Sequence, residues 1–286
     1  MRIAVLGASG FVGRHLVAAL RARGDDVRAA SLRKLEDAVA ACDGAQAVVN
    51  LAGEPIAQRW TPRVKTKLRA SRIDATRALL EALRRGGSGP SVYVSASAIG
   101  YYGTSETSTF VESSAPGTDF LARLCVDWEA AADAATTLGM RVAKVRTGLA
   151  LGTDGGALAK LLPIFRAGAG GMVASGRQWY SWIAIDDLIG VYLHALDRVE
   201  GPLDATAPNP VRNAEFTRAL ARALHRPAML PVPTFALRGL LGEAALVLTQ
   251  GQRVLPERTA ATGYVFRYPS LDEALGVLLR SRKGRA

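Results

Sequence analysis

The chain has 286 residues, 49% hydrophobic and 21% charged, which is typical of a globular protein with a sizeable core. Its formal net charge of +11 raises the question of nucleic acid binding. However, the arginines are scattered over many helix-like stretches, and no recognition motif accompanies them. The charge therefore favours solvated arginine-rich surfaces, or small phosphate-bearing ligands, over nucleic acid.

Cysteine usage and the N-terminal stretch indicate the compartment. Cys42 and Cys125 are far apart and show no metal-type spacing, so we expect free thiols in a reducing environment and no metal site. The chain enters an apolar strand at once, without a signal-peptide pattern, and no apolar run reaches the roughly 18 residues of a membrane span. We expect a cytoplasmic protein that does not bind membranes.

Short β-branched runs alternate with longer amphipathic stretches over the first half of the chain. This alternation predicts an α/β fold, a doubly wound parallel sheet with crossover helices. The predicted strands span residues 2–7, 26–31, 45–53, 91–97 and 141–149. The predicted helices span residues 11–24, 61–86 and 118–139.

The composition changes after residue 150, where glycine and proline become frequent. A strand-like start and a helix follow at residues 181–196. Beyond Pro231 the chain has helical segments of its own, at 235–252 and 268–281. We therefore predict a first domain over residues 1–230 and a small C-terminal, substrate-side subdomain over residues 231–286.

The segment "GASGFVG" follows the first strand and opens the first helix, which is the context of a dinucleotide-binding turn. Gly7 allows the tight turn, Gly10 lets the backbone approach a diphosphate, and Gly13 lets the helix pack against the strand. The free amides and positive dipole end of the helix favour the same anion. The other predicted cofactor contacts of this turn are Ser9, Phe11 and Val12.

The end of the second strand bears on the choice between NAD and NADP. A carboxylate about 20 residues beyond the glycine turn usually holds a free ribose 2′-hydroxyl. This chain instead has Ser31, Arg33 and Lys34 there, a hydroxyl and two cations suited to a 2′-phosphate. The residues favour NADP over NAD, and the alternative for Arg33 is a solvated arginine at a helix start.

Segments further along the chain carry a resemblance to a known family: "VVNLAGEPI", "VSASAIGYYG" and "SWIAIDDL". With them, nearly the whole chain resembles the extended short-chain dehydrogenases/reductases, the nucleotide-sugar epimerases and dehydratases with a Rossmann fold. More narrowly, "NLAGEPIAQRW", "GQRVLP" and the C-terminal stretch resemble an atypical, YfcH-like branch with a C-terminal domain of unknown function.

The resemblance implies further cofactor contacts at the ends of the third, fourth and fifth strands. These contacts are Leu51, Ala52, Gly53, Ser95, Ala96, Thr147 and Gly148. For Ser95, and for Asn50 at the end of the third strand, strand-end hydrogen bonding is the alternative role.

The stretch "FLARLCVDWE", residues 120–129, falls where this family has its active-site helix. Family members carry Tyr-x-x-x-Lys there, in which the tyrosine exchanges a proton and the lysine grips the ribose, followed by a glutamate. When that glutamate is matched to Glu129, Leu121 replaces the tyrosine and Cys125 replaces the lysine. The apolar spacing of the stretch predicts packing, and we expect Cys125 to be a buried structural thiol.

Other residues must therefore carry any acid/base chemistry. The resemblance matches Ser97 to the family's active-site serine or threonine. Tyr101 and Tyr102 follow on the loop at the carboxyl end of the sheet, where open α/β folds bind ligands. Each phenol is either a proton donor or a residue that lines the pocket, and we name all three residues as candidate catalytic groups.

Four charged residues allow two interpretations each. Arg72 replaces a family asparagine, and it is either a cation at the cofactor pocket or a surface arginine. Arg146 ends the fifth strand and either binds an anionic substrate or forms an ion pair. Asp186 and Asp187 are expected to cap the following helix rather than to catalyse.

Two hypotheses of different class follow from these residues. The first is an NADP-dependent oxidoreductase or epimerase that acts on a small or nucleotide-linked substrate with an unconventional proton donor. The second is a non-catalytic dinucleotide-binding sensor or scaffold, favoured by the loss of tyrosine and lysine. A small molecule is the expected partner, and the oligomeric state stays open, with a homodimer as one possibility.

Overall fold

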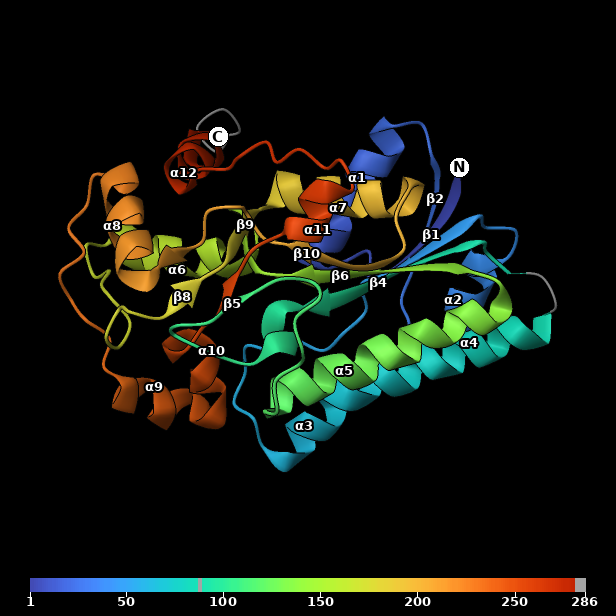
Figure 1. Ribbon diagram of the computed structural model, residues 1–286, viewed down its shortest axis with the longest axis horizontal. Coiled ribbons are helices and arrows are strands. Elements are labelled where there is room, and N and C mark those ends of the chain that lie inside the picture. The colour runs from blue at the N-terminus through green and yellow to red at the C-terminus, as the bar shows by residue number, and fades with distance from the viewer. Residues whose placement is uncertain (87–88, 281–286) are drawn as a thin grey trace.

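The computed structural model describes residues 1–86 and 89–280. Its centre is a six-stranded sheet with the order β10-β6-β4-β3-β1-β2, in which every neighbouring pair is parallel (Figure 1). The strands are β1 Arg2–Leu6, β2 Asp26–Ala30, β3 Ala47–Asn50, β4 Val92–Ala98, β6 Arg141–Thr147 and β10 Gly201–Ala205. Because the order runs outward from β1 in both directions, the doubly wound α/β prediction is confirmed.

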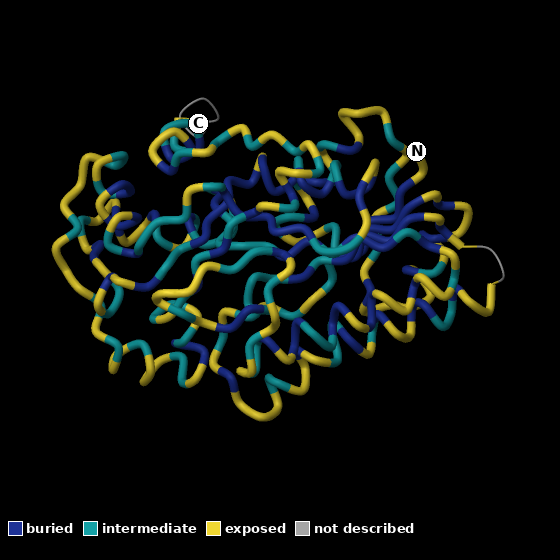
Figure 2. The backbone as a smooth tube through the Cα atoms, in the orientation of Figure 1, coloured by how far each residue is buried: buried dark blue, intermediate teal, exposed yellow. Residues whose placement is uncertain are grey.

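Helices cover both faces of the sheet (Figure 1). One face packs against α1 Phe11–Ala22 and α7 Ile185–Asp197, and the other against α2 Leu35–Cys42, α4 Ala75–Gly86 and α5 Phe120–Asp133. Along β1, Ile3 and Val5 belong to the first core, and Ala4 and Leu6 to the second. The central strands β1 and β3 are therefore almost wholly buried, as Figure 2 shows for the middle of the sheet, because both of their faces are covered.

Several predicted elements differ in their bounds. The predicted helix at 61–86 is α3 Pro62–Arg69, a π-helical turn Ala70–Asp74, and α4. The predicted helix at 118–139 is α5 followed by a 3₁₀ turn, Ala134–Leu138. The predicted strand at 141–149 divides into β6 and β7 Leu149–Leu151, because Gly148 turns the chain between them. The edge strand β10 was not predicted, and the helix expected after the second strand is the short α2.

The region between residues 149 and 230 extends the carboxyl edge of the sheet. There β7 pairs with β9 Trp182–Ala184, and β8 Trp179–Tyr180 pairs with β11 Val211–Arg212. The helices of this region are α6 Gly156–Arg166 and α8 Asn213–Leu224.

The C-terminal segment wraps around this edge. Its elements are α9 Thr234–Leu241, a 3₁₀ turn Gly242–Ala245, α10 Leu246–Thr249, β12 Arg253–Val254, α11 Glu257–Ala261 and α12 Leu271–Arg280. β12 pairs in parallel with β5 Thr109–Phe110, and Leu275 and Leu278 of α12 join the main core. The domain boundary at residue 231 stays a prediction, and residues 281–286 of the predicted subdomain lie outside the described residues.

A buried carboxylate, Glu112, fastens the C-terminal segment to the sheet. Its Oε1 accepts hydrogen bonds from the backbone N–H and hydroxyl of Thr259, both at 2.8 Å, and from the N–H of Asp204 at 3.2 Å. Its Oε2 accepts from the N–H of Arg258 at 3.0 Å. The Glu112 carboxylate thus accepts hydrogen bonds from backbone N–H groups at the start of α11 and from one on β10, and so joins the two elements.

We expect Glu112→Ala to lower the free energy of unfolding by about 2–4 kcal/mol, because several buried N–H groups lose their acceptor. Urea unfolding followed by circular dichroism measures the change. Glu257→Ala, an exposed carboxylate of the same helix, is the matched control. Equal stability of the two variants would contradict this role of Glu112.

Candidate functional site

The glycine turn between β1 and α1 has the geometry that an anion cradle requires. Gly7 has a φ of 85°, and a Cβ there would lie 2.9 Å from the backbone of Leu51 and Ala52. A Cβ on Gly13 would lie 2.3 Å from the carbonyl oxygen of Gly7. Both positions therefore require glycine, for the turn and for helix packing respectively, as the sequence predicts.

Gly10 differs from the other two glycines, because a Cβ on it would approach only the carbonyl oxygen of Gly7, at 3.3 Å. It is the N-cap of α1, where no side chain caps the helix and the first turn has no acidic residue. The first amides of the helix are therefore available to a ligand. An open glycine over free amides fits the diphosphate of a dinucleotide.

A hollow of about 430 Å³ adjoins the turn beside the edge strand β2. Its lining residues are Ala8, Ser9, Arg14, Val17, Ala18, Arg21 and Ala29. Arg14 and Arg21 were not predicted as site residues. The sequence held a signal for them, because residues seven positions apart lie on the same face of a helix. Phe11 turns away from this hollow and packs against the glycine-rich loop at residues 152–156.

Arg33 lies exposed beyond the end of β2. Its Nη2 is 3.2 Å from Oε2 of Glu54, and its backbone N–H donates to the Ser31 hydroxyl at 3.3 Å. Glu54 comes from the loop after β3, so the two strand ends meet at this ion pair. The Arg33 side chain is 83% exposed, so an anion from solvent can reach it.

The residues after β3 are fixed by the buried Asn50. Its Nδ2 donates to the Thr76 hydroxyl at 3.1 Å and to the Tyr93 hydroxyl at 2.9 Å, and its Oδ1 accepts from the N–H of Ala52. Asn50 therefore makes strand-end hydrogen bonds that set the course of residues 51–53. Arg72 packs against Gly53 and is half-buried, so it is not a surface arginine.

At the end of β4, two serines are committed to internal hydrogen bonds. The Ser95 hydroxyl donates to the carbonyl of Ala96 at 3.0 Å, and the Ser97 hydroxyl donates to Oε1 of Glu129 at 2.7 Å. On the neighbouring strand, a Cβ on Gly148 would lie 2.3 Å from the Ser181 carbonyl oxygen. Thr147 and Gly148 thus lie where β6 passes into β7, the partner of β9, beside the end of β4.

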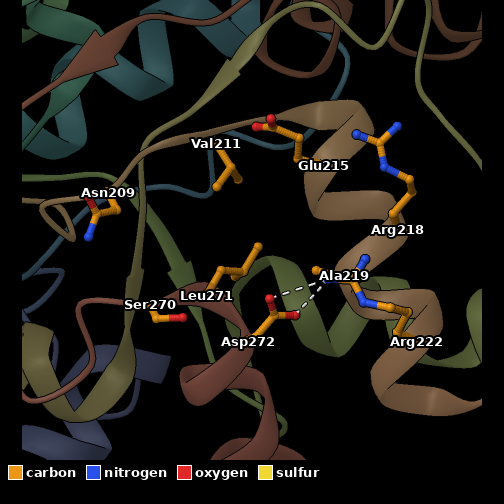
Figure 3. A pocket seen from close by; sticks show the side chains of 9 residues that line it. All are labelled: Asn209, Val211, Glu215, Arg218, Ala219, Arg222, Ser270, Leu271 and Asp272. Atoms are coloured by element: carbon orange, nitrogen blue, oxygen red, sulfur yellow. Dashed lines mark hydrogen bonds and ion pairs between the residues drawn. The ribbon is translucent and has the colours of Figure 1, made fainter.

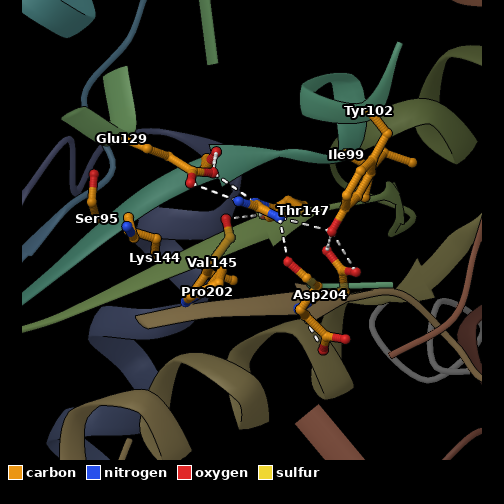
Figure 4. A network of polar contacts seen from close by, with 12 residues as sticks. Ser95, Ile99, Tyr102, Glu129, Lys144, Val145, Thr147, Pro202 and Asp204 are labelled. Carbon is orange, nitrogen blue, oxygen red and sulfur yellow. Dashed lines mark hydrogen bonds and ion pairs between the residues drawn. The ribbon is translucent and has the colours of Figure 1, made fainter. Parts of the chain in front are cut away.

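The guanidinium of Arg146 is the centre of a buried network, in which Figure 4 shows Glu129, Tyr102 and Asp204 converging. Its Nε and Nη2 each lie 2.8 Å from a carboxylate oxygen of Glu129, and its Nη1 donates to the Tyr102 hydroxyl at 2.9 Å. Burial alone would lower the pKa of Arg146, but the hydrogen bonds and charge of Glu129 raise it above its ordinary value. Of the two roles predicted for Arg146, the structure therefore shows the ion pair at the end of the strand.

The two candidate tyrosines have different environments. The Tyr102 hydroxyl is buried and lies 2.8 Å from both carboxyl oxygens of Asp204. Burial raises the pKa of Tyr102. The Tyr101 ring is stacked against Arg146, with 3.5 Å from Cζ to the ring centroid. Within residues 1–86 and 89–280, its hydroxyl has no hydrogen-bond partner, so Tyr101 alone of the three candidates has a free polar group.

Helix α5 places Leu121 and Cys125 beside the loop after β4, since a Cβ on Gly100 would contact both. The Cys125 thiol is buried, and burial raises its pKa to about 12, so it stays protonated and is no nucleophile at neutral pH. The expectation of a structural thiol agrees with this environment. Leu124 and Trp128 of the same helix pack into a third apolar cluster.

The capping role expected for Asp186 and Asp187 is wrong. Helix α7 begins after Ala184, and no side chain caps it. Asp187 instead accepts hydrogen bonds from the backbone N–H groups of Arg267 and Tyr268, at 2.8 and 2.9 Å. Its carboxylate thus anchors the C-terminal segment, a contact between residues 80 positions apart that local sequence does not reveal.

A second hollow, of about 370 Å³, lies between α8 and α12 (Figure 3). Across it Arg222 pairs with Asp272 at 3.0 Å, whereas Glu215 and Arg218, which also line the hollow, form no ion pair with a described residue. In the described part of the chain, no cluster of three or more potential ligands forms a metal site. Among the described helices, none combines the length and apolar character that crossing a membrane requires.

The parallel sheet, the glycine turn and the open Gly10 together define a dinucleotide-binding protein of Rossmann type. The model of the NAD dependent epimerase/dehydratase family matches residues 3–206, and a domain of unknown function, DUF1731, matches residues 232–278. The chain belongs to the NAD dependent epimerase/dehydratase family, within the short-chain dehydrogenase/reductase superfamily.

Relatives match over nearly the whole chain. The chloroplastic SDR39U1 homologue of Arabidopsis thaliana, an epimerase family protein, is 43% identical and covers 98% of this chain and 87% of its own. Human SDR39U1, solved with NADPH, is 35% identical with a TM-score of 0.90, covering 98% of this chain and 99% of its own. The UDP-glucose 4-epimerase of Thermus thermophilus, solved with NAD, covers both chains fully with a TM-score of 0.82, but at 19% identity it shows the fold alone.

The buried Asp204 carboxyl makes stability depend on pH. Burial, followed by the charge of Glu112, raises the pKa of Asp204 well above its ordinary value of 3.8. The folded state therefore retains a proton that the unfolded chain releases above that value. The contribution of Asp204 to stability is complete at low pH and is lost as the pH rises towards the raised pKa.

We expect Asp204→Asn to become more stable relative to wild type as the pH rises from about 5 to about 8, by up to about 1.4 kcal/mol per pH unit. Urea unfolding across this range provides the free energies. The exposed Asp272→Asn serves as control. Parallel pH profiles of wild type and Asp204→Asn would contradict the protonated carboxyl.

Proposed function

We propose that this protein binds NADP(H) in the crevice over the glycine turn and works as an NADP-dependent oxidoreductase or epimerase. The observation that carries the proposal is the open Gly10 above the free amides of α1. Arg33, the cation beyond the end of β2, supports NADP over NAD as the cofactor. The NADPH bound to human SDR39U1, a 35% identical relative, supports the same choice. NAD in more distant neighbours leaves the choice between the two to experiment.

The residues proposed to hold the cofactor follow the strand ends in order. The turn contributes Gly7, Ser9, Gly10, Phe11, Val12 and Gly13, and the adenosine side contributes Ser31 and Arg33. The later strands contribute Leu51, Ala52, Gly53, Ser95, Ala96, Thr147 and Gly148, with Arg72 from the π-helical turn. Of these, Arg33 distinguishes the two cofactors, because only NADP carries a 2′-phosphate for a guanidinium to contact.

When bound, the nicotinamide supplies or accepts the hydride, and the protein must move a proton on the substrate. Tyr101 is the proposed donor, because Ser97 donates to Glu129 and Tyr102 lies against Asp204. Arg146, which stacks on the Tyr101 ring, fixes the position of the phenol. Ser97 and Tyr102 then serve the same site by holding Glu129 and Arg146 in place. The proposed substrate is a small or nucleotide-linked carbonyl or alcohol.

A second function, a dinucleotide-binding sensor or scaffold, is favoured by one observation. Leu121 and Cys125 leave α5 with neither a phenol nor a cation where the family's catalytic pair lies. The two functions differ in turnover. Tight NADPH binding without NADPH oxidation or NADP reduction, across a panel of carbonyl compounds and nucleotide sugars, would establish the sensor.

We expect Arg33→Ala to weaken NADPH binding by about 10- to 100-fold and to leave NADH binding unchanged, since one charge-assisted contact to the 2′-phosphate is lost. Isothermal titration calorimetry measures both affinities. The surface variant Arg85→Ala is the control. An unchanged ratio of NADPH to NADH affinity in Arg33→Ala would remove this residue from the proposal.

If the protein turns over a substrate from the panel, Tyr101→Phe is expected to lower kcat by about 100- to 10,000-fold, the range for loss of a positioned proton donor. NADPH affinity should stay at the wild-type value. Tyr268→Phe, which removes a hydroxyl that contacts Asp186 rather than a residue of the β4 loop, is the matched control. An undiminished kcat in Tyr101→Phe would leave the reaction without its proposed acid.

A further inference from the structure

Strand β2 forms one of the two edges of the main sheet (Figure 1). The N–H of Asp26 donates to the residue before β1 at 2.8 Å, and the carbonyl of Ala30 accepts from the residue after β1 at 3.0 Å. Because the bonding residues of a strand alternate, the backbone groups of Val27 and Ala29 point away from β1. Their outward N–H and C=O groups have no hydrogen-bond partner within the described chain.

The opposite edge of the sheet, β10, has its outward groups satisfied. The Pro202 carbonyl accepts from the Arg258 guanidinium at 2.6 Å. The Asp204 carbonyl accepts from the Thr259 hydroxyl at 3.1 Å, and the Asp204 N–H donates to Glu112 at 3.2 Å. The C-terminal segment therefore completes the β10 edge from within the chain, whereas no described segment does so for β2.

The hollow of about 430 Å³ lies between α1 and the free edge of β2. Besides residues of the glycine turn, Ala29 lines it from β2, and α1 contributes Arg14, Val17, Ala18 and Arg21. These four residues of α1 share one face, because positions three, four and seven apart lie on the same side of a helix. Alternate side chains of a strand placed beside β2 would point toward α1 and enter this hollow.

The hollow is apolar in its middle and positive at its ends. Along α1, Val17 and Ala18 lie between the two arginines. Arg21 is exposed and forms no ion pair with a described residue, and Arg14 has one long ion pair, of 3.6 Å to Asp154. No carboxylate lines the hollow. Its charge therefore complements an acidic ligand with a small apolar centre.

The β2 edge lacks features that keep exposed edges from pairing with other chains, such as a proline or a β-bulge. It pairs with β1 residue for residue over its 5 positions, and it contains no proline. Its charged side chains are engaged within the chain. Asp26 lies 2.9 Å from Arg2, and Arg28 donates to the Asp43 carbonyl at 2.7 Å. The outward backbone groups are therefore accessible to a further strand.

We infer that β2 is a docking edge for an extended acidic segment of a partner protein, which adds a strand to the sheet. Three alternate side chains of that segment, acidic, small apolar and acidic, lie over the α1 face from Arg14 to Arg21. Hydrogen bonds to Val27 and Ala29 supply affinity, and the ion pairs supply specificity. The inference goes beyond the proposed function, because it uses the edge of the sheet rather than the cofactor crevice.

The spacing of the two arginines suits this segment. Positions 14 and 21 are about 10.5 Å apart along a helix axis, and residues four apart in a strand are separated by about 13 Å. The long, flexible arginine side chains cover the difference. A second copy of this chain fits less well, because pairing two β2 edges would bring the arginines of both copies together.

The probe is a fluorescein-labelled peptide, Thr-Asp-Thr-Val-Thr-Asp-Thr. Fluorescence anisotropy at low ionic strength measures its affinity, since salt screens surface ion pairs. Wild type is expected to bind it at least about tenfold more tightly than the same peptide with lysine in place of both aspartates. Equal affinity for the two peptides would overturn the inference.

Two N-methylated forms of the peptide separate strand pairing from charge alone. One form is methylated on the backbone nitrogens of the aspartates and valine, and the other on those of the threonines between them. Only one of these sets faces β2, because the backbone groups of a strand alternate in direction. One form is expected to bind at least about tenfold more weakly and the other like the unmodified peptide. Equal affinities of the two forms would contradict the added strand.

Variants of the protein test the same contacts. Arg21→Glu reverses one charge of the hollow and is expected to bind the peptide at least about fivefold more weakly. Arg63→Glu, the same change at an exposed arginine of α3, is the matched control and should bind like wild type. Ala29→Pro removes an outward N–H, which an edge strand tolerates, and should lose at least about tenfold in affinity. If circular dichroism shows that Ala29→Pro does not fold, the methylated peptides on wild type decide.

Two other results would assign the hollow differently and overturn the inference. Displacement of the peptide by saturating NADPH would assign the hollow to the cofactor site. Self-association of wild type that Ala29→Pro abolishes, without peptide binding, would assign the edge to a second copy. A protein that binds the peptide but neither NADPH nor NADH would overturn the proposed function and support this inference.

Discussion

The buried ion pair between Arg146 and Glu129 is the interaction on which the arrangement of the candidate site depends. Both side chains are almost fully buried, and the pairing is bidentate. Separating such a pair would leave an uncompensated charge inside the protein, at a cost of about 3–5 kcal/mol. Because Arg146 lies on β6 and Glu129 on α5, the pair fixes the helix against the sheet, and Arg146 also holds the β4 loop through its contacts with Tyr101 and Tyr102.

This constraint extends to the C-terminal segment through shared hydrogen bonds. Tyr102 connects Arg146 to Asp204 on β10, and Glu112 joins Asp204 to the start of α11. The chain that follows residue 230 is therefore coupled to the end of β4, where the proposed substrate would bind. A change in the C-terminal segment can reach the Tyr101 ring through no more than four side chains. This continuity gives a physical reason for the two matched family regions to occur together in one chain.

Much of the fold was predictable because its signals are local. Apolar runs marked the buried strands, and the spacing of Gly7, Gly10 and Gly13 marked the turn and the helix that it opens. The rest depends on distant partners. Tyr102 and Asp204 are 102 positions apart, and nothing near either residue indicates the other. The π-helical turn around Arg72 also escaped prediction, because its residues are compatible with a regular helix and only packing against Gly53 and Trp128 distinguishes them.

Helix α5 supports the site rather than performing its chemistry. Of its polar groups at the site, the Cys125 thiol stays neutral because burial raises its pKa to about 12, and Glu129 is an anion that is already paired. Neither group attracts a diphosphate or donates a proton at neutral pH. Positive potential at this site must therefore come from the amides of α1 and from arginines on other elements. Glu129 nevertheless determines the site's geometry, since it orients both Arg146 and the Ser97 hydroxyl. Under the proposed function this helix positions the site, and the proposed proton donor comes from the β4 loop beside it.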